Sequence, residues 1–378
     1  MKNVLIVGAG LSGLSCSHYL NKKGIATKIF DSQKSIGGKV NSEHDANNLY
    51  DIGFQVLLNN YSEVKKIIRY SDLNLKYFNS GASIFTNGSF LNLYNPIFHP
   101  YLFINSNINK IFTYTDYLNL IKTLFTQKES PSLSTMSYLQ NYFSHQSIDL
   151  FFKPFFGGVF LNNKLENDVD FFLKLIKKFT FGKAAIPEQG MAALPKAIFK
   201  RCELTKLHLN EEIYKIDNNK AYFKKGHIES FDHIVLALPL NIIKKIMQLD
   251  NNVKYNSNTT VYFSTDHIFK SKNILLIPDK SYQVNSIQFL SSVSKSYSNY
   301  NGTFLSASSN IKNANSEQIK HECQNILNIK DENIKLNKSY SIQNALHKKS
   351  IYLKSKNNIH FCGDWSEEPS IDGAIKSG

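Results

Sequence analysis

Apolar residues follow two patterns along the chain, short runs that are typical of strands and a three-and-four spacing that is typical of helices. Both patterns occur near its start. An apolar run over 2–7 predicts a short strand, and apolar positions three and four apart from Leu11 to His18 predict one face of a helix. Gly24 is placed to end this helix, and a second apolar run over 26–30 predicts another strand. This order of elements is typical of the βαβ unit of a parallel sheet.

The later segments differ in pattern. Residues 60–180 are aromatic-rich with helical spacings, including one apolar face over 116–125, whereas 245–340 is mostly strand-like. A turn at 225–226 predicts a hairpin. The predicted helices are 116–125, 134–143, 193–201, 316–327 and 369–378, and the predicted strands are 207–209, 211–216, 222–224, 232–239, 259–264, 273–277, 284–289, 303–306 and 358–362.

Three glycines occupy the point where the first strand turns into the first helix. Gly8 permits a tight turn, Gly10 lets the backbone approach a pyrophosphate, and Gly13 lets the helix pack closely on the sheet. The free N–H groups of that helix would then face the phosphates. Asp31, at the end of the second strand, can accept hydrogen bonds from ribose hydroxyls. The order of these features predicts a bound dinucleotide rather than a bare structural turn.

Several other kinds of site are excluded by spacing. Leu14 and Ser15 stand where a phosphate-binding P-loop needs Lys and an adjacent Ser or Thr. The eleven histidines lack metal-binding spacing, and no G-x-S-x-G nucleophile elbow occurs. The four cysteines are scattered without C-x-x-C spacing, which argues against a disulfide framework or a zinc site. The sequence therefore predicts no metal and identifies no catalytic residue.

Size and charge narrow the class of protein. With 378 residues, 42% of them hydrophobic, the chain is expected to form two joined globular domains. No apolar run approaches bilayer-spanning length, and the first strand leaves no room for a leader peptide, so a cytoplasmic protein is expected. The net charge of +14 is spread along the chain, which favours a solvated surface over a nucleic-acid stripe. A basic face at a membrane surface is the alternative.

A second glycine pair follows the βαβ unit. The sequence from Asp31-Ser32 to Gly37-Gly38-Lys39 resembles the acid-then-GG-R/K extension of FAD-binding flavoproteins, which is found in flavin amine oxidases, protoporphyrinogen oxidases and phytoene-desaturase-like enzymes. Two further glycines let a second loop approach the cofactor, and a cation can face its pyrophosphate. The family usually has Arg where this chain has Lys39, and Lys keeps the charge but loses the bidentate fork.

The C-terminal segment resembles the family's closing motif. The strand over 358–362, Gly363-Asp364 and the helix over 369–378 match its G-D/E…G-A-x-x-S-G pattern. In the family the acid contacts the ribityl–phosphate region, and the helix N-terminus points at the pyrimidine side of the flavin. Helix N–H groups there stabilise the negative charge of reduced flavin. Taken alone, the segment is equally well a helix capped by Ser370.

Weaker resemblances lie between the two motifs. Residues 49–56 resemble the D-x-G segment that passes the flavin ring, and 184–195 resemble the P-x-x-G-M-x-x-L-P segment that leads back into the FAD domain. For residues 49–56 the alternative is a simple turn before a strand. The resemblance also implies an adenine contact at Ile213, and there the alternative is an ordinary residue of a strand. The cofactor-binding residues that the resemblance implies are Gly8, Gly10, Leu11, Ser12, Gly13, Asp31, Ser32, Gly38, Lys39, Gly53, Phe54, Ile213, Ala237, Gly363, Asp364, Ser370, Ile371 and Ala374.

The resemblance also implies a fold and its division. The expected class is α/β, with a Rossmann-type FAD-binding domain built on a parallel sheet and interleaved with an α+β substrate domain of mixed sheet and helices. The FAD-binding domain is expected over 1–58, 189–244 and 343–378. The substrate domain is expected over 59–188, where it is mainly helical, and over 245–342, where it is mainly sheet.

The densest aromatic cluster covers 151–161. Pro154 and the pair Gly157-Gly158 predict that it bends rather than forming one straight helix. Core packing explains every phenylalanine in it, and the wall of an apolar substrate cavity explains them equally well. A patch that dips into a membrane is a third and weaker interpretation.

The activity that the resemblance implies is FAD-dependent, two-electron oxidation of an apolar small molecule, with hydride passing to flavin N5. Amine oxidation and C–C desaturation are both open, and FAD is expected to be bound non-covalently. The alternatives are a flavin-dependent isomerase or mutase without net redox change, and a non-catalytic flavoprotein that binds a lipid or protein partner. A nicotinamide dehydrogenase would leave the second glycine pair and the C-terminal motif unexplained. A monomer or a homodimer is expected, without a nucleic-acid partner.

Overall fold

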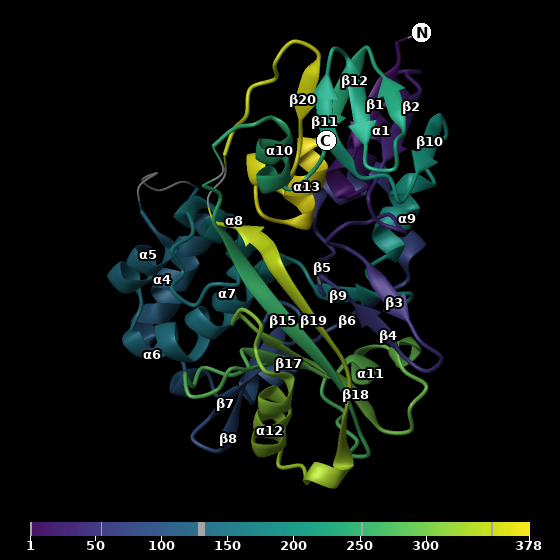
Figure 1. The fold of residues 1–378 in the computed structure, drawn as a ribbon. Coiled ribbons are helices and arrows are strands. Elements are labelled where there is room, and N and C mark those ends of the chain that lie inside the picture. Colours follow the sequence, from purple (N-terminus) through teal and green to yellow (C-terminus); the bar gives the residue numbers. More distant parts are fainter. Residues whose placement is uncertain (1, 54, 128–132, 251, 349–350) are drawn as a thin grey trace.

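Two large sheets organise the protein. The computed structural model describes residues 2–53, 55–127, 133–250, 252–348 and 351–378. A parallel sheet lies at one end of the molecule and a mixed sheet at the other, and the long strands β15 and β19 run between them (Figure 1). The purple start and the yellow end of the chain both belong to the parallel-sheet end. The α/β class predicted from the sequence is confirmed.

The parallel sheet draws its strands from three distant parts of the chain. All four of its strand pairs are parallel, and every residue of the central strand β1 is buried, which is typical of a sheet covered on both faces. Because the strands are parallel, their carboxyl ends lie at one edge of the sheet. In spatial order the strands are β10 (Thr205–His208), β2 (Thr27–Phe30), β1 (Val4–Val7), β14 (His233–Leu236) and β20 (Ile359–Phe361).

Helix α1 (Leu11–Lys22) follows β1 and packs against the sheet as the sequence predicted. Leu14 and His18 are buried, and Gly24 ends the helix with φ +74°. Two helices from later in the chain, α9 (Ala193–Phe199) and α13 (Ile371–Ser377), pack on α1. The start and the end of the described chain are thereby held together.

The mixed sheet has seven strands in the order β19-β15-β18-β17-β16-β7-β8, and helix α12 (Ser316–Leu327) packs on it. Only the pair of β7 with β16 is parallel. The predicted strands and α12 were found in place, but the flanking strands β7, β8 and β19 were not predicted. The strands are β19 (Ile334–His347), β15 (Tyr255–Thr265), β18 (Thr303–Ser309), β17 (Ser286–Gln288), β16 (Ile274–Leu276), β7 (Gly81–Thr86) and β8 (Ser89–Tyr94).

Smaller elements complete the sheets and the helical layer. The remaining strands are β3 (Ser42–His44) with β4 (Leu49–Asp51), β5 (Leu57–Leu58) and β6 (Leu75–Tyr77) on either side of β9 (Ala184–Pro187), and the predicted hairpin region β11 (Ile213–Asp217), β12 (Lys220–Phe223) and β13 (Ile228–Ser230). The other α-helices are α2 (Ser62–Ile67), α3 (Pro100–Ile104), α4 (Tyr114–Phe125), α5 (Thr135–Tyr142), α6 (His145–Ser147), α7 (Lys153–Phe160), α8 (Val169–Phe181), α10 (Leu240–Ile246) and α11 (Leu290–Val293).

The aromatic cluster, for which the sequence predicts a bend, begins in a π-helical turn and continues as α7. A wide π-helical turn over Ile148–Phe152 leads directly into α7, so 145–160 is helical throughout. Pro154 lies in the first turn of α7, directly after the π-helical turn, and has no N–H to donate to the carbonyls of that turn. Gly157 and Gly158 lie inside α7. A Cβ on Gly157 would lie 2.3 Å from the side chain of Asn163, and a Cβ on Gly158 would lie 2.7 Å from the side chain of Asn285. These glycines therefore permit close packing of α7 against the two asparagines.

Helix α4 is amphipathic as predicted, but much of its apolar face is turned to solvent. Leu118, Ile121 and Phe125 are exposed, whereas Asp116 and Thr123 are buried. Residue spacing predicts that a helix has an apolar face, but it does not say which neighbour covers that face.

We expect Gly13→Ala to destabilise the protein and Gly10→Ala to be tolerated. A Cβ on Gly13 would lie 1.9 Å from the backbone oxygen of Gly8, whereas a Cβ on Gly10 meets no atom within 4 Å among the described residues. Chemical denaturation of the apoprotein should show a loss of about 2 kcal/mol or more for Gly13→Ala. Gly10→Ala, at a helix N-cap, should lose about 1 kcal/mol or less. Equal losses would contradict this packing of α1 on the turn.

Candidate functional site

The first glycine turn forms an open cradle at the carboxyl edge of the parallel sheet. Gly8 has φ +110°, and a Cβ on it would lie 2.2 Å from the backbone oxygen of Ala237. The N–H of Ala237 donates to Val7 O at 2.8 Å, so Ala237 supports the turn from behind. Gly10 is the N-cap of α1, whose first turn has neither a capping side chain nor an acidic residue. No side chain among the described residues therefore caps the first N–H groups of α1.

Asp31 ties this turn to the end of β2. One carboxylate oxygen accepts the N–H of Ala9 at 2.6 Å and the other accepts the N–H of Gln33 at 2.8 Å. Burial raises the pKa of Asp31, and these two N–H groups oppose that rise. Each carboxylate oxygen has a second lone pair, so the side chain can still accept hydroxyl donors. The neighbouring Ser32 is exposed.

The second glycine pair lies directly on the first turn. The N–H of Gly37 donates to Ala9 O at 2.8 Å, and a Cβ on Gly38 would lie 3.4 Å from the Cα of Gly10. Lys39 follows, with its Nζ 3.2 Å from a carboxylate oxygen of Asp364. The predicted N-terminal and C-terminal motifs therefore meet through this ion pair.

The C-terminal motif places α13 beside the ion pair. The N–H of Gly363 donates to Ser377 Oγ at 3.0 Å, and Ser370 caps α13 by accepting the N–H of Gly373 at 2.9 Å. Ile371 is buried at the start of α13, and Ala374 is half-buried one turn later. The sequence-based expectation that Ser370 caps a helix here is confirmed.

Two predicted residues of the first turn and one in a neighbouring sheet face the core. Leu11 and Ser12, in the first turn of α1, are 5% and 7% exposed. Ile213, in β11, is buried in a cluster with Val7 and Leu236. Phe54 lies outside the described residues. The structure thus gathers the glycine and charged positions at one edge and leaves Ile213 in the core.

Asp51 links the D-x-G segment to the segment that precedes α9. Its carboxylate accepts the N–H of Met191 at 2.8 Å, the hydroxyl of Ser42 at 2.6 Å and the phenol of Tyr297 at 2.7 Å. Burial raises the pKa of Asp51 to about 6, and these donors oppose the rise. A Cβ on Gly53 would lie 1.9 Å from Lys39 O, so this loop also runs against the second glycine pair.

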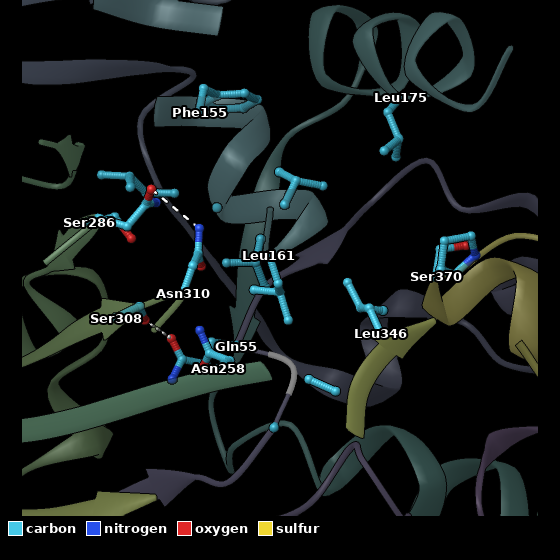
Figure 2. A pocket seen from close by; sticks show the side chains of 18 of the residues that line it. Gln55, Phe155, Leu161, Leu175, Asn258, Ser286, Ser308, Asn310, Leu346 and Ser370 are labelled. Atoms are coloured by element: carbon cyan, nitrogen blue, oxygen red, sulfur yellow. Dashed lines mark hydrogen bonds between the residues drawn. The ribbon is translucent and has the colours of Figure 1, made fainter. Parts of the chain in front are cut away.

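A cavity extends from this edge toward the mixed sheet. Its volume is about 200 Å³. Lys39, Gly53 and Ser370 line the end nearest the glycine turns. Figure 2 shows Leu175, Leu346 and Ser370 on one side, and the polar side chains of the mixed sheet on the other. The cavity thus runs from the predicted cofactor-binding edge of the parallel sheet to the mixed sheet.

The aromatic cluster serves both functions considered from the sequence. Phe152, Phe156 and Phe160 are buried in the helical core, whereas Phe155 and Val159 line the cavity. Core packing and the cavity wall are therefore opposite sides of one helical segment.

Three asparagines of the mixed-sheet region hold α7 across the cavity. The side-chain N–H groups of Asn285, Asn310 and Asn256 donate to the backbone oxygens of Pro154, Gly157 and Phe160, at 3.2, 2.8 and 2.9 Å. Each amide satisfies a carbonyl of α7. Neutral amide groups therefore attach α7 to the mixed-sheet region beside the cavity.

The lining has almost no charge. Among the described residues that line the cavity, Lys39 is the only charged one. The remaining polar lining consists of Tyr61 and amide and hydroxyl side chains such as Gln55, Asn258 and Ser308. Gln55 is itself held by Thr260, to which it donates at 2.9 Å. The cavity suits a largely apolar and uncharged molecule.

A histidine that the sequence did not single out lies beside the ion pair. His347 is 1% exposed, and neither ring nitrogen has a hydrogen-bond partner among the described residues. Burial lowers its pKa, and Asp364 opposes this effect. It pairs across the sheet with Tyr255, whose ring lies 5.8 Å from Lys39 Nζ. No local motif marks it, because β19 reaches this edge only through the folded sheet.

Neither a metal site nor a membrane span was found. In the part of the chain that the structure describes, no group of three His, Cys, Asp or Glu side chains could hold a metal ion. None of the helices described is both long and apolar enough to cross a bilayer.

Known proteins resemble this chain in sequence and in fold. The family model described as flavin containing amine oxidoreductase matches residues 11–325. The 4,4'-diaponeurosporene oxygenase of Staphylococcus haemolyticus is 29% identical over 139 residues, which are 34% of this chain and 27% of that protein. Protoporphyrinogen oxidase 2, chloroplastic/mitochondrial, of Arabidopsis thaliana is 25% identical over 170 residues, 42% of this chain and 32% of that protein. The chain thus matches less than a third of the length of either relative.

A solved structure matches the whole fold. The crystal structure of an oxidoreductase from Methanosarcina mazei superposes with a TM-score of 0.78. The match covers 99% of this chain and 98% of that chain at 16% sequence identity. The two proteins therefore share an architecture.

We expect Asp51 to make the stability of the protein depend on pH. Its folded pKa of about 6 lies above the ordinary 3.8, so the protonated carboxyl stabilises the fold below about pH 4, and this contribution is lost as the pH rises through 6. Two pKa units correspond to about 3 kcal/mol. The free energy of unfolding of Asp51→Asn, taken relative to that of wild type at the same pH, should therefore be about 3 kcal/mol higher at pH 8 than at pH 4.

Urea denaturation of both proteins across this pH range measures the difference. Asp279→Asn is a matched control, because backbone and side-chain hydrogen bonds from Ser281 lower the pKa of that nearly solvent-exposed carboxyl. Parallel pH profiles for wild type and Asp51→Asn would contradict the prediction.

Proposed function

The chain belongs to the flavin containing amine oxidoreductase family, and from that premise we propose that it is an FAD-dependent oxidoreductase that removes two electrons from an uncharged, largely apolar small molecule. The observation that carries this proposal is the cavity, whose described lining holds a single charged side chain, Lys39, which directly follows the second glycine pair. Oxidation of a C–C bond fits such a cavity better than oxidation of an amine.

The residues at the sheet edge fit an FAD pyrophosphate. Space is open at Gly10, the first N–H groups of α1 are uncapped, and Gly38 lies against Gly10 without a side chain between them. Lys39 would add a positive charge, and Asp31 would accept ribose hydroxyls. Gly53, Ser370 and Ile371 would lie along the flavin side. Bound there, FAD would supply the acceptor for the electron pair, without a covalent link to the protein.

The protein's own contribution is to exclude water and to orient the substrate. The side chains of Phe155, Val159 and Leu175 form the apolar wall, and the asparagine contacts fix α7 opposite the sheet. An ammonium ion in this cavity would have no carboxylate partner among the described lining residues, and burying an unpaired charge costs several kcal/mol.

Negatively charged substrates fit less well. The chain has only two arginines, Arg69 and Arg201, and neither lines the cavity. Lys39 already pairs with Asp364. A mutase acting on a sugar nucleotide, or an oxidase of a porphyrinogen with several carboxylates, would need more cationic groups than the described lining offers.

We expect the protein reconstituted with FAD to show oxidised-flavin absorption bands and to release FAD on acid denaturation. Gly10→Ala should weaken FAD binding by about a hundredfold or more, because its Cβ occupies the space where the pyrophosphate must approach the backbone. Flavin fluorescence titration measures both affinities. Ser286→Ala, which alters only the cavity, should bind FAD as wild type does. A colourless protein that takes up no FAD would refute the cofactor assignment, and colour retained by the denatured protein would refute non-covalent binding.

We expect conjugated hydrocarbons, and not alkylamines, to bleach the bound flavin in the absence of oxygen. Val159→Phe should slow this bleaching by about tenfold or more, because the larger side chain fills the cavity. The affinity for FAD should not change. Rapid bleaching by a primary alkylamine, with none by a polyene or cyclic hydrocarbon in detergent micelles, would contradict the proposed substrate class.

A further inference from the structure

Helix α4 exposes a continuous apolar stripe. Tyr114, Leu118, Ile121 and Phe125 are spaced four, three and four residues apart, which places them along one side of the helix. They are 78%, 45%, 54% and 79% exposed. Single exposed apolar residues are ordinary on protein surfaces, but an aligned row of four is not.

The opposite face of α4 is fixed to the protein by polar contacts. Asp116 is 1% exposed, and its carboxylate accepts the N–H of Ser144 at 2.7 Å and the hydroxyl of Ser144 at 2.6 Å. It also accepts the N–H of Thr113 at 2.7 Å, which completes the N-terminal cap of α4. The helix cannot rotate to bury its stripe without breaking these bonds, so the stripe faces outward in the folded protein.

The segment that precedes α4 in the chain also carries exposed apolar and positively charged side chains. Tyr101 and Ile104 of the preceding helix α3 are 85% and 79% exposed. Lys110 and Lys122 are exposed, and the only carboxylate between residues 95 and 127, all of which are described, is the buried Asp116. Exposed apolar side chains with lysines and no exposed acid are typical of segments that lie in the headgroup region of a bilayer.

We propose that the α4 stripe, together with Tyr101 and Ile104, docks the protein on a lipid bilayer that contains anionic headgroups. A second copy of the chain is a poorer occupant, because each copy carries a net charge of +14 and would bring the same lysines face to face. An anionic surface is attracted by that charge. This differs from the interpretation of 151–161 as a membrane patch, because most of that segment is core and cavity wall.

The proposed docking face lies one layer from the cavity. Leu120 and Leu124, on the inner side of α4, pack against the hydrophobic core cluster that contains Phe152 and Phe156. Phe155 and Val159 pack on the same cluster and line the cavity. If the proposed function holds, an apolar substrate dissolved in the bilayer would be close to the enzyme that oxidises it, but the docking proposal itself does not depend on the activity.

Co-sedimentation of the full chain with phosphatidylcholine vesicles, with and without phosphatidylglycerol, tests the proposal. Wild type should bind the anionic vesicles and bind the neutral ones weakly. The variant Ile121→Ser with Phe125→Ser should bind anionic vesicles about tenfold or more weakly, because two inserted side chains are lost. The variant Lys110→Ser with Lys122→Ser should bind about twenty-fivefold more weakly at low salt, since each lysine contributes about fivefold.

A matched control removes exposed apolar side chains elsewhere. Ile268→Ser with Tyr352→Ser changes residues that are 73% and 77% exposed and should bind vesicles as wild type does. All of these substitutions are at the surface, so thermal unfolding should be unchanged and a folding defect can be recognised. Vesicle binding that is unaffected by the α4 substitutions would overturn the proposal. A second result would also overturn it. In that result wild type does not bind vesicles and sediments as a dimer, and the variant Ile121→Ser with Phe125→Ser sediments as a monomer.

Discussion

The structure depends on backbone packing against backbone where β1 ends. No side chain separates Gly8 from Ala237, or Gly13 from Gly8, and a Cβ at either glycine would lie about 2 Å from a carbonyl oxygen. This contact brings α1 down onto the sheet and leaves Gly10 as the open position. The second glycine pair, the D-x-G loop and Lys39 are all placed relative to this turn.

A second organising feature is the helical run that separates core from cavity. The same stretch, 145–160, supplies rings to the core on one side and lining on the other, and asparagines from the mixed sheet satisfy its carbonyls. Because these contacts use amides rather than charges, they add no charge to the cavity beside α7. Its chemistry thus follows from how α7 is held.

The parts predicted from the sequence are those encoded locally. The βαβ unit, the cap at Ser370 and α12 each depend on residues within a few positions of one another, so spacing was sufficient. The hairpin of β7 and β8 was missed although Asn87-Gly88, both at positive φ, is a strong turn signal. Strand β19 was missed because much of it is polar and exposed. The direction of the α4 stripe, the Lys39–Asp364 pair and the environment of His347 depend on distant segments, which no local pattern describes.

The interleaving of the two sheets has a consequence for how the chain reaches this state. Ser15 of α1 donates a hydrogen bond to the backbone oxygen of Ile375 in α13, 360 residues later. Contacts of such long sequence separation form only after large loops have closed, which makes folding slow and favours populated intermediates. During synthesis the glycine turn emerges first, yet it must wait for β14, β20 and α13 before its surroundings are complete. The mixed sheet, whose strands β15 to β19 are nearly consecutive, can assemble earlier, so most of the mixed sheet is expected to form before the carboxyl edge of the parallel sheet is complete.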